Sequence, residues 1–314
     1  MHYMGSKAGH AADIIKIATA NRKPGQYFCE PFVGAGNVIC RVDGPRIGND
    51  LNWRMIALLD AVGNKGWLPP ETMTEAEFKR ILDDPDGHLP ELVAFVATTA
   101  FGSVWMGPWV KGGMKYRQGR DAAMRDAPGL RGVKFVSMRY EDFGPYIPAE
   151  SIVYCDPPYA DASGYSNLSP RRNGAATTIE VGQDMTLNTW NRVAFWKWAD
   201  ALVDAGHDVF VSEYNGPPAH IYDGRTPELK AERDLLLAQA KITDKDPKAG
   251  NRETLRTQLA DVDRRIRDER ERLAARWVVL WSKEVVSDFH SKREAGVKKG
   301  KTEIEKLFHR EDAR

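Results

Sequence analysis

The sequence has few cysteines and no long apolar run. Cys29, Cys40 and Cys155 are its three cysteines, and they form neither a Cys-x-x-Cys pair nor a Cys/His cluster. That spacing gives no sign of a disulfide framework or of a zinc site. No apolar run approaches the roughly 18 residues that a membrane-spanning helix needs, and residues 1–10 show no signal-peptide pattern. We therefore expect a cytoplasmic protein with no bound metal and no membrane partner.

The sequence also lacks a strong excess of charge of either sign. It carries 45 Lys and Arg against 44 Asp and Glu, which gives a net charge of +1. This balance excludes a uniformly basic nucleic-acid coat protein, so affinity for phosphate would depend on local patches. One candidate patch is residues 111–120, with four basic residues and no acid, and a second is residues 292–301.

Short β-type runs alternate with helical patterns along most of the chain. Residues 53–62 and 188–205 have the apolar spacing of amphipathic helices, and short apolar runs before and after them predict strands. This alternation is typical of an α/β sheet with helices packed on it. The predicted strands are residues 26–29, 46–49, 134–138, 151–155, 207–212 and 277–281.

Two segments interrupt the alternation. Residues 67–133 contain helical stretches at 75–82 and 91–100, which are followed by a basic loop rich in Gly and Trp. Residues 226–275 are highly charged and helical in pattern, with a break at 244–251. Because apolar residues recur at coiled-coil spacing after this break, we expect an antiparallel coiled-coil hairpin. These apolar residues are Leu255, Leu259, Val262, Ile266 and Leu273.

A glycine-bearing turn follows the first predicted strand. Gly34 and Gly36 stand between that strand and a helical pattern. Glycine lets a backbone approach a ligand closely, and a helix N-terminus favours anionic groups. Asp50 follows the second predicted strand, where a carboxylate can accept hydrogen bonds from both hydroxyls of a ribose. Each feature has a plainer alternative, a tight structural turn for the glycines and a helix N-cap for Asp50.

The strongest chemical signal is the tetrapeptide Asp156-Pro157-Pro158-Tyr159, directly after the predicted strand 151–155. In open α/β sheets, ligands bind outside the carboxyl ends of strands. A carboxylate and a fixed backbone carbonyl can accept hydrogen bonds from an exocyclic amine and stabilise the charge that develops as it attacks a methyl carbon. Two prolines fix φ and so hold the Pro157 carbonyl. Tyr159 offers a ring on which an extruded base can stack. The plainer alternative is a proline-rich turn.

Four motifs occur in one order along the chain. They are residues 3–7, residues 30–36, Asp50 and residues 156–159. In this order they resemble the Dam-like (D12 class) adenine-specific DNA N6-methyltransferases, particularly the phage-type members. Residues 211–217 are also similar to a segment of the phage-type members. The resemblance covers residues 1–66, 92–117, 133–225 and 276–308, and the hairpin at 226–275 departs from it.

The resemblance implies a Rossmann-like sheet that binds S-adenosylmethionine and transfers its methyl group to adenine N6 of a base flipped out of double-stranded DNA. Residues 1–66, 134–225 and 276–314 would form the catalytic domain, residues 67–133 the target-recognition region and residues 226–275 a hairpin insertion. The location implied is a bacterial or phage-infected cell, with a role in phage, restriction–modification or host DNA methylation. The catalytic residues implied are Asp156, Pro157, Pro158 and Tyr159. The cofactor-binding residues implied are Tyr3, Lys7, Glu30, Pro31, Phe32, Gly34, Gly36, Asp50 and Asp156.

Other functions stay open at this point. Methylation of cytosine N4, or of adenine in RNA, uses the same chemistry, although cytosine-N4 enzymes more often carry serine at the position of Asp156. A glutamine-methylating enzyme would typically have asparagine there. A different class is a non-catalytic nucleic-acid-binding scaffold that works through the hairpin. The intact tetrapeptide at 156–159 argues against that class.

The basic segment 111–120 and the aromatic residues before it are candidates for DNA contact. Trp105 and Trp109 would either wedge into DNA or pack locally. The candidate DNA-binding residues are Trp105, Trp109, Lys111, Lys115, Arg117 and Arg120.

The hairpin at 226–275 has no counterpart in the resemblance. Its apolar seam is enough to join two helices, which leaves Leu235 and Leu237 as a surplus for self-association or a protein partner. Basic residues in 264–272 are offset by acidic residues nearby, so the sequence does not predict a strong grip on phosphate. We expect a protruding arm that is dispensable for cofactor binding and that contacts protein rather than taking part in catalysis.

Overall fold

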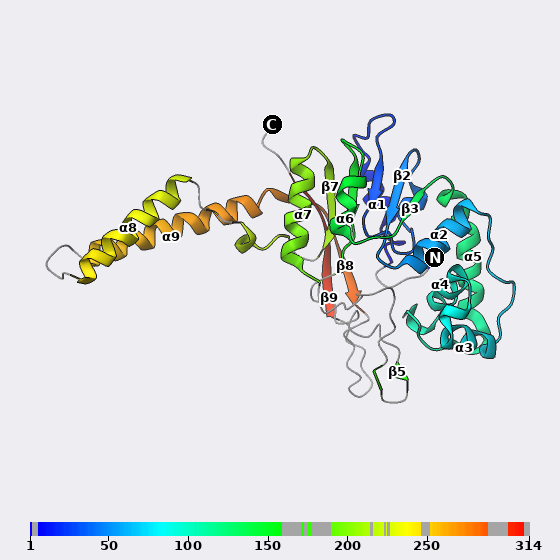
Figure 1. Ribbon diagram of the computed structural model, residues 1–314. Coiled ribbons are helices and arrows are strands. Elements are labelled where there is room, and N and C mark those ends of the chain that lie inside the picture. The colour runs from blue at the N-terminus through cyan, green and yellow to red at the C-terminus, as the bar shows by residue number, and fades with distance from the viewer. Residues whose placement is uncertain are drawn as a thin grey trace.

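The computed structural model describes residues 1, 6–103, 105–158, 171–172, 175–176, 190–213, 216–222, 224, 227–245, 252–287 and 301–310. Within these residues, a seven-stranded mixed sheet is covered by helices, and a two-helix arm projects from one side (Figure 1). The α/β class expected from the alternating pattern is therefore confirmed, and the sheet is compatible with a Rossmann-like fold.

The sheet has the strand order β3-β2-β1-β4-β7-β9-β8. The first five strands in this order run parallel, whereas β9 is antiparallel to both of its neighbours. The chain places β2 and β3 on one side of β1 and then crosses to β4 on the other side, so the order reverses between β1 and β4. The strands are β1 Phe28–Glu30, β2 Arg46–Asn49, β3 Lys134–Val136, β4 Ile152–Cys155, β7 Asp208–Glu213, β8 Trp277–Ser287 and β9 Lys301–Arg310; β5 Arg171–Arg172 and β6 Ala175–Ala176 form a separate two-stranded sheet.

Strand β4 shows why the predicted strands form. All four of its residues are buried. Ile152 and Tyr154 belong to one core cluster, whereas Val153 and Cys155 belong to the other. Successive side chains of a strand point to opposite faces, so a parallel strand covered on both faces reads as a continuous apolar run.

The two faces of the sheet are covered by different helices. Helices α1 (Ala11–Ala18) and α2 (Trp53–Asn64) contribute to one core cluster, and α7 (Arg192–Asp204) contributes to the other. Side-chain caps fix where two of them begin. The Asn52 Oδ1 atom accepts a hydrogen bond at the start of α2, and Asn191 Oδ1 does so at the start of α7. Shorter helices on the sheet are α6 Tyr140–Phe143 and the 3-10 turns η1 Ile39–Arg41, η5 Gly144–Tyr146 and η8 Ala219–Ile221.

Residues 67–133 form a helical layer beside α2 (Figure 1). It contains α3 Glu75–Asp83, α4 Pro90–Thr98, α5 Met114–Leu130 and the 3-10 turns η2 Pro85–Gly87, η3 Phe101–Ser103 and η4 Lys111–Gly113. Helices α3 and α4 confirm the two predicted helical stretches. A capping box between Thr74 and Glu77 begins α3.

The predicted basic loop at 111–120 is wrong for most of its length, because α5 begins at Met114. Gly112 and Gly113 have positive φ and end the loop just before the helix. Tyr116 and Gly119 then recur at helical spacing on the buried face of α5. A Cβ atom on Gly119 would lie 2.6 Å from Thr99 Cγ2, so glycine is what allows this close approach. High Gly content and charge hid this helix from sequence reasoning.

The last predicted strand is longer than expected and has an unpredicted partner. Residues 277–281 begin β8, which extends to Ser287 and pairs antiparallel with β9. Strand β9 was missed because Lys and Glu occupy much of Lys301–Arg310 and leave no apolar pattern typical of a strand. Two apolar residues of β9, Leu307 and Phe308, are buried in the two core clusters.

Two helices occupy the segment that was predicted to form a hairpin. Helices α8 (Pro227–Lys245) and α9 (Arg252–Ala274) pack along each other and project from the sheet (Figure 1). Four of the five residues predicted at coiled-coil spacing, Leu255, Leu259, Val262 and Ile266, pack there against Leu229 and Leu236 of α8, whereas Leu273 is half-buried outside this cluster. Leu235 is 60% exposed, which agrees with the prediction that the seam between the two helices does not use it. No helix in the described ranges is long and apolar enough to cross a membrane.

Candidate active site

A pocket opens at the carboxyl ends of β1 and β4, where the strand order reverses. In open α/β sheets, ligands bind outside the carboxyl ends of strands at this kind of reversal. Glu30 ends β1, and Asp156 directly follows β4. The pocket is lined by Ser6, Lys7, Glu30, Phe32, Val33, Gly34, Ala35, Asn37, Val38, Tyr154 and Asp156.

The glycine turn forms one wall of this pocket. Gly34 and Gly36 have φ values of 50° and 70°, a region that residues with a side chain rarely adopt. A Cβ atom on Gly36 would also lie 3.1 Å from Leu130 Cδ2 and 3.2 Å from Leu59 Cδ2. Gly36 therefore serves both the turn and the packing beneath it, while Gly34 and Ala35 face the pocket.

Asp50 fixes the same turn from the end of β2. One of its carboxylate oxygens accepts a hydrogen bond from the Gly34 backbone N–H at 2.9 Å, and the other accepts one from the Asn52 backbone N–H at 2.8 Å. The N-cap of α2 is Asn52, not Asp50. Burial raises the pKa of Asp50, and these two backbone hydrogen bonds oppose that effect. Asp50 lies next to the pocket without lining it.

Lys7 and Asp156 form an ion pair inside the pocket. The Lys7 Nζ atom lies 2.9 Å from Asp156 Oδ1, and their side chains are 7% and 19% exposed. Two charges in such surroundings are costly unless they are paired. The two residues lie far apart in the sequence, so only the fold brings them together.

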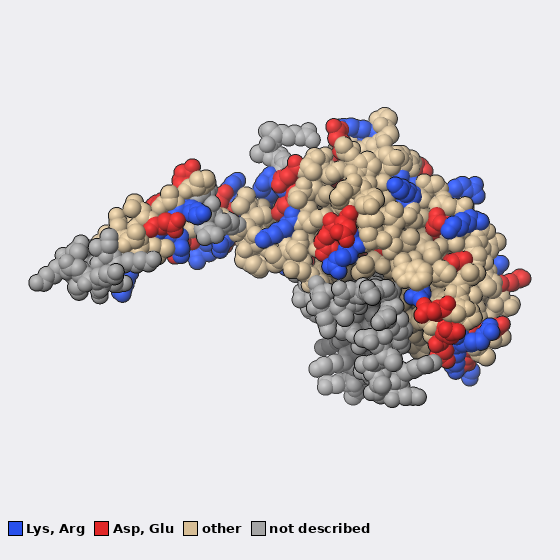
Figure 2. Space-filling view, in the orientation of Figure 1, with Lys and Arg blue, Asp and Glu red and all other residues tan. Residues whose placement is uncertain are grey.

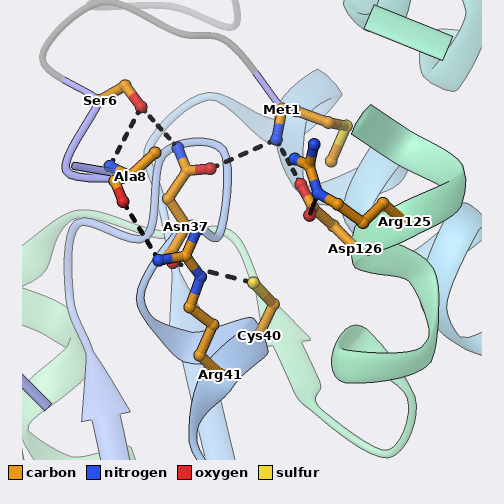
Figure 3. Close-up of polar contacts among 8 residues, drawn as sticks. All are labelled: Met1, Ser6, Ala8, Asn37, Cys40, Arg41, Arg125 and Asp126. Atoms are coloured by element: carbon orange, nitrogen blue, oxygen red, sulfur yellow. Dashed lines mark hydrogen bonds and ion pairs between the residues drawn. The ribbon is translucent and has the colours of Figure 1, made fainter. Parts of the chain in front are cut away.

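Polar contacts dock the chain on either side of Lys7 onto the glycine turn (Figure 3). The Asn37 side-chain NH₂ donates to Ser6 Oγ at 2.9 Å, and Arg41 Nη1 donates to the Ala8 carbonyl oxygen at 3.1 Å. The amino group of Met1 contacts both Asn37 Oδ1, at 3.3 Å, and Asp126 Oδ2, at 2.5 Å. These contacts hold Lys7 against Asp156. The sequence analysis did not single out Ser6, which lies within the motif 3–7, or Asn37, which directly follows the motif 30–36.

Glu30 is the most deeply buried acid of the pocket. It is 3% exposed. Burial raises its pKa well above the usual value, the nearby Asp156 charge raises it further, and a backbone hydrogen bond from Ile39 opposes both effects. Among the described residues, Glu30 Oε1 has no hydrogen-bond partner. A buried acceptor without a partner is costly, and a ligand that donates a hydrogen bond to it would relieve that cost.

The remaining predicted site residues have mixed positions. Phe32 lines the pocket and packs against Tyr140 and Trp190, with ring centroids 5.4 and 5.9 Å away. The Pro31 carbonyl accepts a hydrogen bond from Asn49 Nδ2, so its role is to hold β1 and β2 together. Pro157 is buried and Pro158 is half-buried directly after Asp156. Tyr3 and Tyr159 lie outside the described residues.

The candidate DNA-binding residues do not reach this pocket. Trp105 is only 7% exposed and belongs to the core, and Trp109 packs on Phe78 with ring centroids 5.0 Å apart. Local packing, not a DNA wedge, therefore describes Trp105 in this structure. Arg117 Nη1 donates to the Gly112 carbonyl, and Arg120 Nε donates to the Pro69 carbonyl. Lys111 and Arg117 are exposed, whereas Lys115 and Arg120 are half-buried.

Comparison with known proteins returns no family model and no curated protein that matches this chain.

Proposed function

We propose that this chain is an S-adenosylmethionine-dependent methyltransferase that methylates adenine N6 in double-stranded DNA. The observation that carries the proposal is the position of Asp156, Pro157 and Pro158. They directly follow the buried strand β4, at the reversal of strand order, and Asp156 is held by Lys7 in a pocket beside a glycine turn. A carboxylate, a rigid carbonyl and a ligand pocket meet there in the arrangement that methylation of an amine requires.

The pocket residues fit the amino-acid end of S-adenosylmethionine. Glu30 Oε1, which has no partner among the described residues, could accept a hydrogen bond from the ammonium group. Lys7 carries three N–H donors, so it can pair with Asp156 and also donate to the cofactor's carboxylate. Asp50 stands at the end of β2, where an acid typically binds a ribose. The bound cofactor would supply a methyl group on a sulfonium centre.

The residues after β4 would act on the amine of the flipped base. Asp156 and the Pro157 carbonyl would accept its two hydrogens, which turns the nitrogen lone pair toward the methyl group. A bound cofactor would supply the methyl carbon to this nitrogen and keep the electron pair of the broken carbon–sulfur bond on sulfur, and water would take the proton that the nitrogen then loses. In this proposal, the helical layer at 67–133 recognises the DNA target.

The decisive experiment is expression in a host that lacks DNA methylation, followed by sequencing of plasmid DNA for modified bases. We expect N6-methyladenine at a defined sequence with the wild-type chain and none with Asp156→Ala. N4-methylcytosine instead would change the assigned base. Unmodified DNA from wild-type protein that binds S-adenosylmethionine in calorimetry would contradict the proposed substrate.

A further inference from the structure

The arm separates its charges onto different sides of α9. Three of its arginines pair with acids on the outer side and on one flank of the helix. These salt bridges join Arg264 to Asp261 and Asp268, Arg265 to Glu232, and Arg272 to Glu269. On this side the acids and bases that lie close together in the sequence also pair in the structure, so this side has little net charge.

The opposite flank of the arm is basic. A cleft of about 420 Å³ between the helices is lined by Arg233, Asp263, Ile266, Arg267 and Arg270. At 3.6 residues per turn, Arg256, Arg267 and Arg270 fall within about 60° of one another on α9. Among the described residues that line the cleft, Asp263 is the single acid, and Arg233 Nε pairs with it at 2.8 Å. We call Lys230, Arg233, Arg256, Arg267 and Arg270 the basic flank.

The size of the basic flank fits a duplex backbone. Arg256 and Arg270 are separated by roughly 21 Å along the helix axis at 1.5 Å per residue, which is about six base pairs of DNA. Guanidinium groups bind phosphate oxygens in pairs of parallel hydrogen bonds. Figure 2 shows Lys and Arg atoms along the lower edge of the arm.

The basic flank is less suited to a protein partner. Energetic centres of protein interfaces are desolvated aromatic or apolar anchors. The exposed large apolar residue of the described arm is Leu235, which lies one turn from Glu232, whereas Leu237, one turn from Arg233, is half-buried. Glu232 pairs with Arg265 on the other flank, so Leu235 also lies away from the basic flank.

The arm also projects on a side that DNA in the active site could reach. Strand β8 runs parallel to β7, because both are antiparallel to β9. Its arrowhead marks the lower end of the sheet in Figure 1, so the carboxyl ends of the parallel strands lie there too. The active-site edge therefore faces the same way as the lower edge of the arm, along which Figure 2 shows Lys and Arg atoms.

We propose that the basic flank binds the phosphate backbone of duplex DNA beyond the base pairs held at the active site. This inference rests on the proposed function, because it takes the substrate to be DNA. The contact carries no sequence information and would increase affinity for long duplexes.

The test is a matched pair of triple variants of the full chain. Lys230→Gln/Arg256→Gln/Arg267→Gln removes three charges from the basic flank. Arg264→Gln/Arg265→Gln/Arg272→Gln removes three charges from the other side of the same arm. Binding to a 30-base-pair duplex of mixed sequence is measured by fluorescence anisotropy across a range of salt concentrations. Binding of S-adenosylmethionine is measured by calorimetry in parallel.

We expect the basic-flank variant to lose at least tenfold in DNA affinity at low salt, with its salt slope reduced by about 0.9 for each lost phosphate contact. The other variant should keep the wild-type slope, and both should bind S-adenosylmethionine normally. Equal losses in the two variants, or no loss in the basic-flank variant, would overturn the inference and leave the proposed function standing. Wild-type protein that binds S-adenosylmethionine but no duplex would contradict the proposed function itself.

Discussion

Three ionisable side chains lie in a pocket with little access to water, those of Lys7, Asp156 and Glu30. The Lys7–Asp156 ion pair is nearly buried, and Glu30 lies deeper still. Burial favours the neutral form of a carboxyl group, and a neighbouring carboxylate adds to that preference. Burying these groups destabilises the folded protein, and such an arrangement is typical of functional sites rather than of structural cores.

At Asp156, we predict that replacement by alanine abolishes methyl transfer, because the acceptor for the substrate amine is lost. It should also lower the free energy of unfolding by about 1–3 kcal/mol, since Lys7 stays buried without this ion pair. Asp156→Asn keeps a carbonyl oxygen for Lys7, so it should recover much of the stability and little of the activity. Turnover assays and urea unfolding check both variants. Near-normal turnover of Asp156→Ala would refute the proposed role.

At Asp50, we predict that replacement by alanine weakens S-adenosylmethionine binding by roughly 1.5–3 kcal/mol, the usual loss for hydrogen bonds to a charged group. Part of this loss would come from the glycine turn, because the Gly34 N–H would no longer have the Asp50 carboxylate as its hydrogen-bond acceptor. Asp50→Asn retains one acceptor oxygen and should fall between wild type and alanine. Calorimetry measures the series. Equal affinity across it would leave Asp50 with a purely structural contact.

At Glu30, we predict a pH dependence of stability. Its folded-state pKa is raised, so the stability that it contributes is fully present below its unfolded-state pKa and is lost as pH rises through the folded-state value. Glu30→Gln cannot ionise, so wild type should lose stability relative to this variant as pH increases from about 4.5. Urea unfolding over pH tests this, with exposed Glu71→Gln as control. A constant difference between wild type and Glu30→Gln would contradict the prediction.

At the scale of elements, the turn between β1 and η1 depends on glycine for its backbone conformation and for its packing. Gly36 combines a positive φ with two close side-chain neighbours, whereas Gly66 has a similar φ of 69° and nothing within 4 Å of a Cβ atom. We predict that Gly66→Ala costs about 1–2 kcal/mol through backbone strain alone. Gly36→Ala should cost more, because overpacking adds about 1–3 kcal/mol. Thermal unfolding compares the two, and equal costs would show that Leu59 and Leu130 move aside freely.

At the scale of the whole molecule, the arm is the part least connected to the sheet. Its apolar seam is internal, and α9 touches the sheet domain mainly at η8. We predict that replacing residues 226–275 with a short Gly/Ser linker preserves S-adenosylmethionine affinity, because no arm residue lines the pocket. The deletion should weaken binding to a 30-base-pair duplex, as the basic-flank variant does. Calorimetry and anisotropy measure these effects.

Two outcomes would contradict this picture of the arm. Loss of cofactor binding in a folded deletion variant would make the arm structural to the site. A smaller oligomer after deletion, seen by light scattering, would favour self-association through Leu235 and Leu237.

The amino-acid sequence by itself determined the α/β class, the hairpin and the tetrapeptide after β4, because each depends on local order: alternating periodicity, heptad spacing and a run of neighbouring residues. It did not reveal α5, whose glycines and charges hide a buried face, or β9, whose strand character depends on its partners β7 and β8. Only the tertiary structure brought Lys7 to Asp156 and Asn37 to Ser6, because contacts between distant segments leave no local pattern. It also decided which charges pair between the two helices of the arm, where Arg265 meets Glu232 and Arg233 meets Asp263. Arg256, Arg267 and Arg270, by contrast, share one side of α9 through helical periodicity alone.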